Sequence, residues 1–191
     1  GPPGLGKTTV AKILASIYTK LGFLSNGKLV IVNREDLIGQ YLGETSVKTR
    51  SVLENNKGNV LFIDEAYSLG NGNKNDSDSF AKECVDTLTA FLSENTKDFI
   101  CIIAGYENEL KKCFFAGNPG LDRRFPWKYI LPTYKDDELY NIYMCMLKQK
   151  KWKVRAAFTY DINNKLKQIF SEYNKYFLNN GGDIQIFINC C

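Results

Sequence analysis

The chain opens on the letters GPPGLGKT (residues 1–8), which fit the spacing G-x-x-x-x-G-K-[ST]. A bound phosphate chain needs backbone N–H groups that point at it, and glycines allow this because they adopt unusual dihedrals and carry no side chain. From Thr8 to Lys20 apolar residues recur at helical spacing, and the N-terminal end of a helix favours an anion. This stretch constrains the fold most, because such a loop normally joins a buried strand to a helix.

We therefore expect phosphates to bind at this loop, which has the form of a Walker A motif. Lys7 would reach the β- and γ-phosphates, and the Thr8 hydroxyl would bind Mg²⁺. The alternative is a chance glycine-rich turn, but the full match continues directly into an amphipathic helix. The predicted nucleotide-binding residues are Gly1, Pro2, Pro3, Gly4, Leu5, Gly6, Lys7, Thr8 and Thr9.

Strand-like and helix-like segments alternate along the first two thirds of the chain. Apolar runs predict strands at 28–33, 59–67, 99–106 and 127–132. Helical spacing predicts helices at 8–20, 45–58, 80–92 and 107–115, with loops at 68–78 and 116–125. Because the strands are apolar on both faces, we expect an α/β fold with a parallel sheet covered by helices on both sides.

A break at Pro132-Thr133 separates this pattern from a region that reads as helical only. We predict an α/β core at 1–132 that lacks the strand before the phosphate loop. A small helical lid domain would follow at 133–191, truncated at its C-terminal end.

Composition excludes several kinds of chemistry. The 191 residues contain no histidine, which excludes Ser-His-Asp and Cys-His catalysis and any His-ligated metal site. The six cysteines form no C-x-x-C pair, and we expect a reducing, intracellular and cytoplasmic location. A net charge of +4 says little about partners. No apolar run approaches the ~20 residues that span a bilayer, so we expect no membrane partner.

The second predicted strand ends in two acids, Asp64 and Glu65, within the letters VLFIDE. A carboxylate at a strand end can hold the water shell of Mg²⁺, the role we predict for Asp64. Glu65 can act as the base that activates an attacking water. The alternative is a pair of polar residues at the edge of a strand. The preceding phosphate loop favours the functional interpretation.

The glycine loop, LFIDEA (61–66) and NPGLDRRF (118–125), in this order, make the chain resemble the AAA+ ATPases. The stretches REDLIGQYLGETSVKTR (34–50), VLFIDEAYSL (60–69) and IIAGYENEL (102–110) look like the subfamily of red-type Rubisco activases and stage V sporulation protein K. The resemblance implies a P-loop NTPase sheet flanked by helices, with a helical lid, and ATP and Mg²⁺ as cofactors. It also implies a homo-oligomer, a hexameric ring with ATP between neighbours.

The same resemblance implies roles for three further residues. Arg124, and second to it Arg123, match the arginine finger that reaches the γ-phosphate of the adjacent subunit. The alternative is a surface arginine pair. Tyr106 lies where such ATPases carry a sensor that orients water, although many of them have Asn there. A tyrosine that simply packs at a strand end is the alternative.

The letters QYLGE (40–44) match a central-pore loop that grips a threaded polypeptide. Tyr41 would give a large rigid contact surface, followed by Leu42, and Gly43 would let the loop swing. The alternative is an ordinary exposed tyrosine in a turn.

One departure concerns the helix near the C-terminal end, which in the relatives often begins G-N-A-R and supplies a second sensor arginine. Here the matching letters are NNGGDIQIF (179–187), and Gly182 or Asp183 stands where a cation is expected. Either the chain lacks this arginine or another basic residue serves. The segment that commonly holds adenine lies upstream of the phosphate loop, so no adenine contact is predicted.

We therefore expect an ATPase that binds and hydrolyses MgATP and remodels a protein partner. One alternative is a nucleotide-dependent scaffold or switch that does not hydrolyse ATP. The other is a nucleic-acid-associated loader, which would use the five cations and the tryptophan of KQKKWKVR (148–155). More often such a run is the solvated end of a helix.

Overall fold

The computed structural model describes residues 1–41, 43–70, 78–152 and 159–190. The chain divides into two compact units, Lys7–Ile130 and a second made of Gly1–Gly6 with Leu131–Cys191. Each unit has its own hydrophobic core. The division groups the glycines of the phosphate loop with the C-terminal helices, whereas the domain prediction keeps 1–132 together. The predicted domain boundaries stay a prediction.

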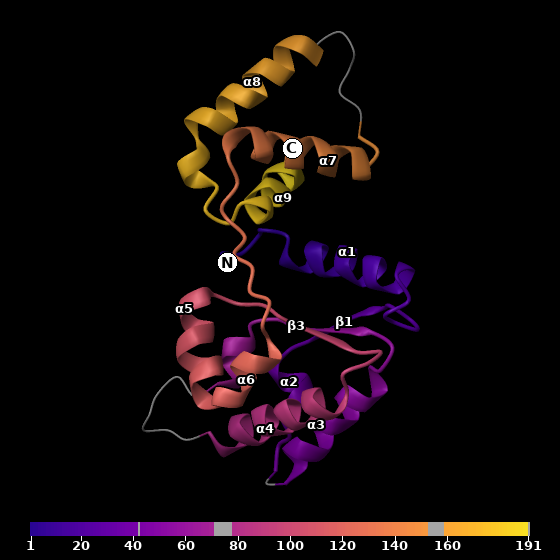
Figure 1. Ribbon diagram of the computed structural model, residues 1–191. Helices are drawn as coiled ribbons and strands as arrows, with labels where there is room; N and C mark the ends of the chain where they lie inside the picture. Colours follow the sequence, from indigo (N-terminus) through magenta and orange to yellow (C-terminus); the bar gives the residue numbers. More distant parts are fainter. Residues whose placement is uncertain (42, 71–77, 153–158, 191) are drawn as a thin grey trace. The chain divides into compact units, whose positions relative to one another are not determined.

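The larger unit is built on a parallel sheet with the strand order β1-β2-β3 (Figure 1). Its strands are β1 (Leu29–Val32), β2 (Val60–Ile63) and β3 (Ile100–Ile103). Val32 lies opposite Ile63, and Ile63 lies opposite Ile103, so the three strands end level with one another. Residues that follow the strands therefore emerge at a single edge of the sheet.

Helices cover both faces of this sheet, as the sequence predicts (Figure 1). The helices concerned are α1 (Lys7–Lys20), α3 (Glu44–Asn55) and α4 (Ser79–Glu94). The side chains of the fully buried strand β2 alternate between the faces. Phe62 packs with Ala11 of α1, whereas Leu61 joins the larger core that contains Leu53 of α3 and Leu88 of α4.

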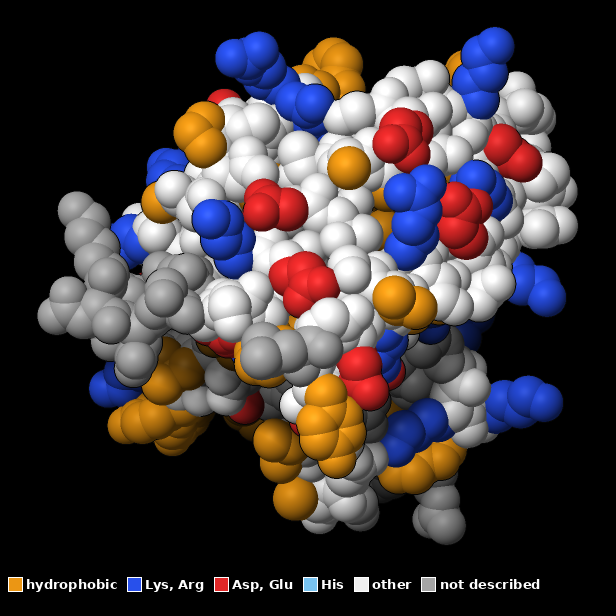
Figure 2. Space-filling view, turned by 90° about the horizontal axis from the view of Figure 1, so that it is seen from below, with side chains coloured by type: hydrophobic (Ala, Val, Ile, Leu, Met, Phe, Trp, Pro, Cys, Tyr) orange, Lys and Arg blue, Asp and Glu red, His pale blue; other side chains and the backbone are white. Residues whose placement is uncertain are grey.

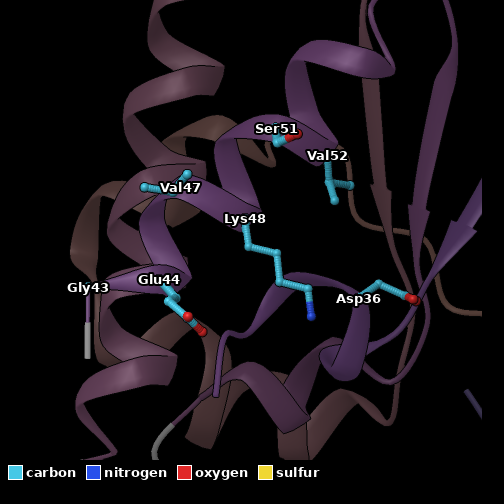
Figure 3. Close-up of a pocket in the computed structure, with 7 residues that line it drawn as sticks. All are labelled: Asp36, Gly43, Glu44, Val47, Lys48, Ser51 and Val52. Carbon is cyan, nitrogen blue, oxygen red and sulfur yellow. The ribbon is translucent and has the colours of Figure 1, made fainter. Parts of the chain in front are cut away.

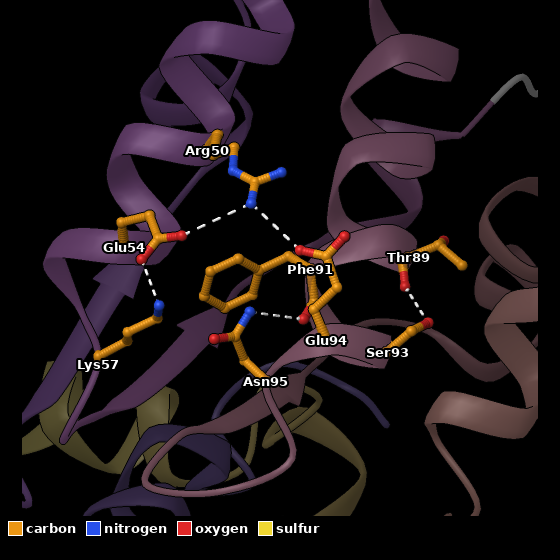
Figure 4. Close-up of polar contacts among 8 residues, drawn as sticks. All are labelled: Arg50, Glu54, Lys57, Thr89, Phe91, Ser93, Glu94 and Asn95. Carbon is orange, nitrogen blue, oxygen red and sulfur yellow. Dashed lines mark hydrogen bonds and ion pairs between the residues drawn. The ribbon is translucent and has the colours of Figure 1, made fainter.

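Charged side chains join α3 to α4 at the surface (Figure 4). The Arg50 guanidinium lies 3.1 Å from the Glu94 carboxylate and 3.8 Å from that of Glu54. Glu54 also pairs with Lys57. At the end of α4, the Ser93 hydroxyl donates a hydrogen bond to the Thr89 carbonyl, 2.8 Å away.

Short elements connect the main ones. They are α2 (Arg34–Leu37), the 3₁₀ helix η1 (Ala66–Leu69), α5 (Glu107–Glu109) and the π-helical turn η2 (Leu110–Phe115). The strand predicted at 59–67 is therefore shorter than expected, because the chain turns immediately after Asp64. Part of the predicted loop at 68–78 completes η1, and residues 71–77 lie outside the described residues.

Two predictions in the region after η2 are wrong. The letters predicted as a loop form helix α6 (Pro119–Arg124), which Asn118 caps by accepting a hydrogen bond of 2.8 Å from the Gly120 N–H. Asn at the N-cap and Pro at the first helical position are helix-start signals as well as turn signals. Residues 127–132, predicted as a strand, belong to no strand in the described part of the chain.

The second unit is helical, as expected. It contains α7 (Asp136–Gln149), α8 (Thr159–Glu172), the 3₁₀ helix η4 (Asn174–Tyr176) and α9 (Gly181–Asn189). Phe170 is fully buried at the centre of its core, with Leu139 of α7 and Ile184 of α9 in the same cluster. Within the described ranges, no helix is long and apolar enough to cross a membrane.

The burial of each cysteine predicts how fast its thiol reacts. Burial raises the pKa of Cys84 to about 11 and that of Cys101 to about 12, while Cys145 and Cys190 are exposed. Since the thiolate is the nucleophile, brief treatment with N-ethylmaleimide at about pH 8 should label Cys145 and Cys190 well before Cys84 and Cys101. Peptide mapping by mass spectrometry measures this, with denatured protein as the control. Equal labelling of all four in the native protein would contradict the packing.

Candidate active site

The carboxyl edge of the sheet brings together several of the residues predicted from the sequence. Asp64 and Glu65 follow β2 directly, and Tyr106 follows β3 after two small residues. Helix α1 begins at Lys7, whose ammonium lies 5.9 Å from the centre of the Tyr106 ring. A cation at this distance from an aromatic face is attracted to it. Lys7, Tyr106 and the two acids therefore belong to segments that begin or end at the same edge.

Glu65 has a strained backbone. Its φ of 49° and ψ of 43° lie in the left-handed region, which costs a residue with a side chain about 1–2 kcal/mol. The next residue, Ala66, is fully buried and its N–H donates to the Ala104 carbonyl, 2.9 Å away. The Glu65 N–H donates to the Asp64 carboxylate, 3.0 Å away. This turn leaves the Glu65 side chain exposed at the edge of the sheet.

Tyr67, which follows the two acids, is half-buried and was not among the residues predicted for the site. Partial burial raises the pKa of Tyr67 above its usual value first, and the negative charge of Glu65 two residues earlier raises it further. The Tyr67 ring lies 6.0 Å from the Tyr106 ring, at an interplanar angle of 44°. The local signal for Tyr67 in the sequence is its place two positions after Glu65.

Arg34 anchors the segment that follows the acids. Its guanidinium donates to the Ser68 carbonyl and to the Asp78 carboxylate, so one side chain joins η1 to the start of α4. Asp78 also caps α4 by accepting from the Ala81 N–H, 3.0 Å away. Partial burial opposes ionisation of Asp78, but the hydrogen bonds from Ala81 and Arg34 and the charge of Arg34 together hold its pKa below its usual value.

Two glycines of the predicted phosphate loop have a left-handed backbone. Gly4 and Gly6 have φ values of 72° and 75°, which glycine adopts without a steric penalty. A Cβ on Gly4 would lie 1.8 Å from the Asn179 carbonyl oxygen, so this position has no room for a side chain. The Gly4 carbonyl accepts a hydrogen bond of 3.1 Å from the Gly181 N–H at the start of α9.

The position where a second sensor cation was expected carries no positive charge. Asp183 lies in the first turn of α9, where its carboxylate accepts from the Asn179 backbone N–H at 2.7 Å and side-chain amide at 3.0 Å. Asp183 therefore fixes the start of this helix. Gly182, the other candidate position, has no side chain.

The two predicted finger arginines differ in their contacts. Both are exposed at the end of α6. Arg124 donates to the Ser93 hydroxyl, at 2.7 Å from Nη2 and 3.1 Å from Nε, and to the Gly120 carbonyl at 3.1 Å. A role for Arg124 in another subunit would require it to leave these contacts. Arg123 lies beside it in the last turn of α6.

The predicted pore loop lies between α2 and α3. The Tyr41 side chain is 68% exposed, and its backbone N–H donates to the Glu44 carboxylate at 3.2 Å. Gly43 caps α3 with a φ of 85°, while Leu42 lies outside the described residues. A shallow hollow beside this loop is lined by residues of α2 and α3, including Lys48 (Figure 3).

The basic run after α7 shows contacts within its own unit. Lys150 donates to the Asn189 side chain at 2.7 Å and lies 5.2 Å from the Trp152 ring centre. Residues 153–155 of this run lie outside the described residues. On the face shown in Figure 2, acidic and basic side chains are interspersed.

Mg²⁺ takes oxygen ligands. Among the residues that the structure describes, no three or more His, Cys, Asp or Glu side chains cluster as a metal site. Mg²⁺ in nucleotide sites takes one or two protein ligands and completes its shell with phosphates and water. Asp64, which is half-buried beside the strained turn, and the hydroxyl of Thr8 suit that mode of binding.

The parallel sheet with its flanking helices and the glycine loop before α1 are features of nucleotide-binding α/β domains. The family model that matches residues 1–114 is that of AAA, the ATPase family associated with various cellular activities. The chain belongs to this family.

The similar proteins confirm the resemblance to the subfamily of red-type Rubisco activases and stage V sporulation protein K. Stage V sporulation protein K of Bacillus subtilis is 36% identical over 95% of this chain and 55% of its own length. A protein described as cfxQ-like from Acanthamoeba polyphaga mimivirus is 44% identical over 82% of this chain and 38% of its own length. The chloroplastic ribulose bisphosphate carboxylase/oxygenase activase of Cyanidioschyzon merolae is 40% identical over 81% of this chain and 52% of its own length. The chain thus spans about half the length of the curated relatives it matches.

A solved structure supports the fold. The AAA domain of FIGL-1, crystallised in complex with ADP, aligns with a TM-score of 0.60 over 89% of this chain and 51% of that one. At 19% identity the likeness concerns the fold alone.

The Arg34–Asp78 contact predicts a pH-dependent contribution to stability. Because the pKa of Asp78 is lowered on folding, its charge stabilises the fold fully above the unfolded value of 3.8, and this contribution is lost as the pH falls through the lower folded value. Asp78→Asn retains a capping residue but loses the charge, so it should reduce the free energy of unfolding by about 1 kcal/mol or less at neutral pH. Denaturant titrations at several pH values test this. A difference that grows below pH 3.8 would contradict it.

Proposed function

We propose that the chain binds MgATP, hydrolyses it, and uses the energy to remodel a protein partner within a homo-oligomeric ring. The observation that carries the proposal is that Lys7, Asp64 and Glu65 occur in segments that begin or end at one edge of a parallel sheet. In open α/β sheets ligands bind outside the carboxyl ends of the strands. Membership of the AAA family supports ATP as the nucleotide.

Each residue has a proposed role. Residues 1–9 bind the phosphates through backbone N–H groups, and the Lys7 ammonium pairs with the β- and γ-phosphates. Thr8 and Asp64 hold Mg²⁺, which when bound neutralises phosphate charge. Glu65 takes the proton from a water molecule as the water oxygen bonds to the γ-phosphorus, while the bond from that phosphorus to the bridging oxygen breaks and ADP leaves. The strained turn supports this role, because it exposes the carboxylate at the strand end.

The arginine pair would complete the site in a neighbouring subunit. A guanidinium is planar and always charged, which suits the negative charge that grows on the γ-phosphoryl group. We propose Arg124 as the finger, released from Ser93 on assembly, with Arg123 beside it. Tyr106 would orient the attacking water as the first sensor, a proposal supported by its contact with Lys7.

The exposed Tyr41, with Leu42 and Gly43, would grip the polypeptide that the ring remodels. The exposure of the Tyr41 ring supports this role, since a large rigid side chain gives contact area at a low entropic cost. The partner is a protein, which agrees with the name of the algal activase among the relatives.

A second candidate function is a nucleotide-dependent switch or scaffold with negligible turnover. Asp183 favours it, because an acid occupies the region where a second sensor cation was expected. Tight ATP binding with ATP-dependent assembly but no phosphate release would support the switch.

Substitution of Lys7 and Glu65 should separate binding from chemistry. Glu65→Gln should bind ATP normally but release phosphate about 10²–10⁴ times more slowly, because the base is lost. Lys7→Ala should lose ATP binding itself, whereas Lys20→Ala, at the other end of α1, serves as the matched control and should retain both. Fluorescent-nucleotide titration and a phosphate-release assay measure the two steps. Unchanged turnover in Glu65→Gln would overturn the proposed mechanism.

A mixing experiment tests whether the arginine acts between subunits. Arg124→Ala should lower the hydrolysis rate about 10³–10⁵-fold while ATP still binds. When Arg124→Ala subunits are mixed with inactive Glu65→Gln subunits, some sites pair an intact base with an intact arginine, and activity should return. Arg123→Ala is assayed in parallel. If the two inactive variants assemble together but no activity returns at any ratio, Arg124 does not act in trans.

A further inference from the structure

Arg124 is held inside its own subunit by Ser93 of α4 and by its own helix. Its Nη2 and Nε both donate to the Ser93 hydroxyl, at 2.7 Å and 3.1 Å, and its Nη1 donates to the Gly120 carbonyl at 3.1 Å. Each of the three guanidinium nitrogens therefore has an acceptor within the subunit. The Ser93 oxygen occupies the Nε–Nη2 edge, which is able to form paired bonds with a phosphate group.

Ser93 is oriented so that it accepts these bonds. It lies in the last turn of α4, and its hydroxyl donates to the Thr89 carbonyl, 2.8 Å away (Figure 4). A hydroxyl has one proton and two acceptor lone pairs. Because the proton is used toward Thr89, the lone pairs of the Ser93 oxygen are left for Arg124.

The helix that carries Arg124 is fixed against α4 by other contacts. At the start of α6, the Asn118 side-chain amide donates to the Asp86 carboxylate of α4, 2.9 Å away. Leu121, in the middle of α6, is fully buried in the main core. Release of Arg124 from Ser93 is therefore a rotation of one exposed side chain and leaves α6 in place.

We propose that Ser93 is a latch for the arginine finger, which holds Arg124 against α4 in the separate subunit and gives it up to the γ-phosphoryl group of a nucleoside triphosphate in a second copy of the chain. The inference rests on the proposed function of Arg124.

The latch acts by competition. To reach a neighbouring subunit, the guanidinium must break its bonds to Ser93 and Gly120, and the cost of breaking them opposes the contact between subunits. Bonds to the charged γ-phosphoryl group are stronger and offset this cost. Ser93 thus raises the subunit concentration at which shared sites form. With ADP there is no γ-phosphoryl group to compete, and Arg124 stays on Ser93.

The test is Ser93→Ala in the full-length protein, assayed for phosphate release across a range of protein concentration. Alanine is the better helix former, so α4 should remain intact. The concentration that gives the half-maximal rate per subunit should fall about 2–10-fold, the effect of losing an exposed hydrogen-bonded contact to a charged group. The plateau rate should not change. Ser171→Ala, an exposed serine in the last turn of α8, is the matched control and should alter neither quantity.

A double variant separates the latch from a structural role. Sedimentation velocity measures assembly with the non-hydrolysable analogue AMP-PNP or with ADP. Ser93→Ala should promote assembly with AMP-PNP but not with ADP, and it should have no effect in an Arg124→Ala background, because the latch acts only through Arg124.

Three results would overturn the inference. They are an unchanged half-maximal concentration in Ser93→Ala, a lower plateau rate in that variant, and an equal effect on assembly with and without Arg124. Each leaves the proposed function standing as long as the wild-type rate per subunit rises with concentration. A wild-type rate that is the same at every concentration would instead overturn the shared site, and the latch with it.

Discussion

The parallel pairing of β1, β2 and β3 is the constraint on which the site depends. Because Val32, Ile63 and Ile103 lie level, everything that follows these strands emerges at one edge. Burial of β2 on both faces fixes this register, since a slip of one residue would exchange the side chains that face α1 with those that face α3 and α4. The chemistry thus depends on apolar packing within the sheet.

The turn after β2 places the side chain of Glu65 at the exposed edge of this packed sheet. Ala66 must be buried and Asp64 continues the strand ladder through a bond of 3.1 Å from its N–H to the Val32 carbonyl, so Glu65 between them takes a left-handed conformation. Strain of this kind persists only where the surroundings impose it. Arg34 holds the segment that follows the turn, because its guanidinium donates to the Ser68 carbonyl.

The sequence predicts the elements that are defined by local pattern. The buried strands and the helices α1, α3 and α4 were predicted because their apolar periodicity reflects the faces they bury. Helix α6 was missed because Asn118-Pro119 begins turns and helices alike. The strand expected at 127–132 was inferred from apolar content alone, which does not reveal whether a partner strand is available.

The residues of the candidate site likewise include some that a local sequence pattern predicts and others that it does not. Motif spacing indicated Lys7, Asp64 and Glu65, since the chemistry demands those residue types at those places. It did not indicate Tyr67, Arg34 or Ser93, because their contacts join segments whose proximity depends on the folded chain. The hydrogen bonds from Arg34 to Asp78 and from Arg124 to Ser93 each span more than thirty residues of sequence.

The central claim is that this edge of the sheet is an ATP-hydrolysing site completed by a second subunit. The most direct measurement is the rate of phosphate release from saturating MgATP by the full-length protein across a wide range of protein concentration. The account predicts a rate per subunit that rises with concentration and then levels off as the shared sites fill. A rate per subunit that is the same at every concentration, or no phosphate release at all, would contradict it.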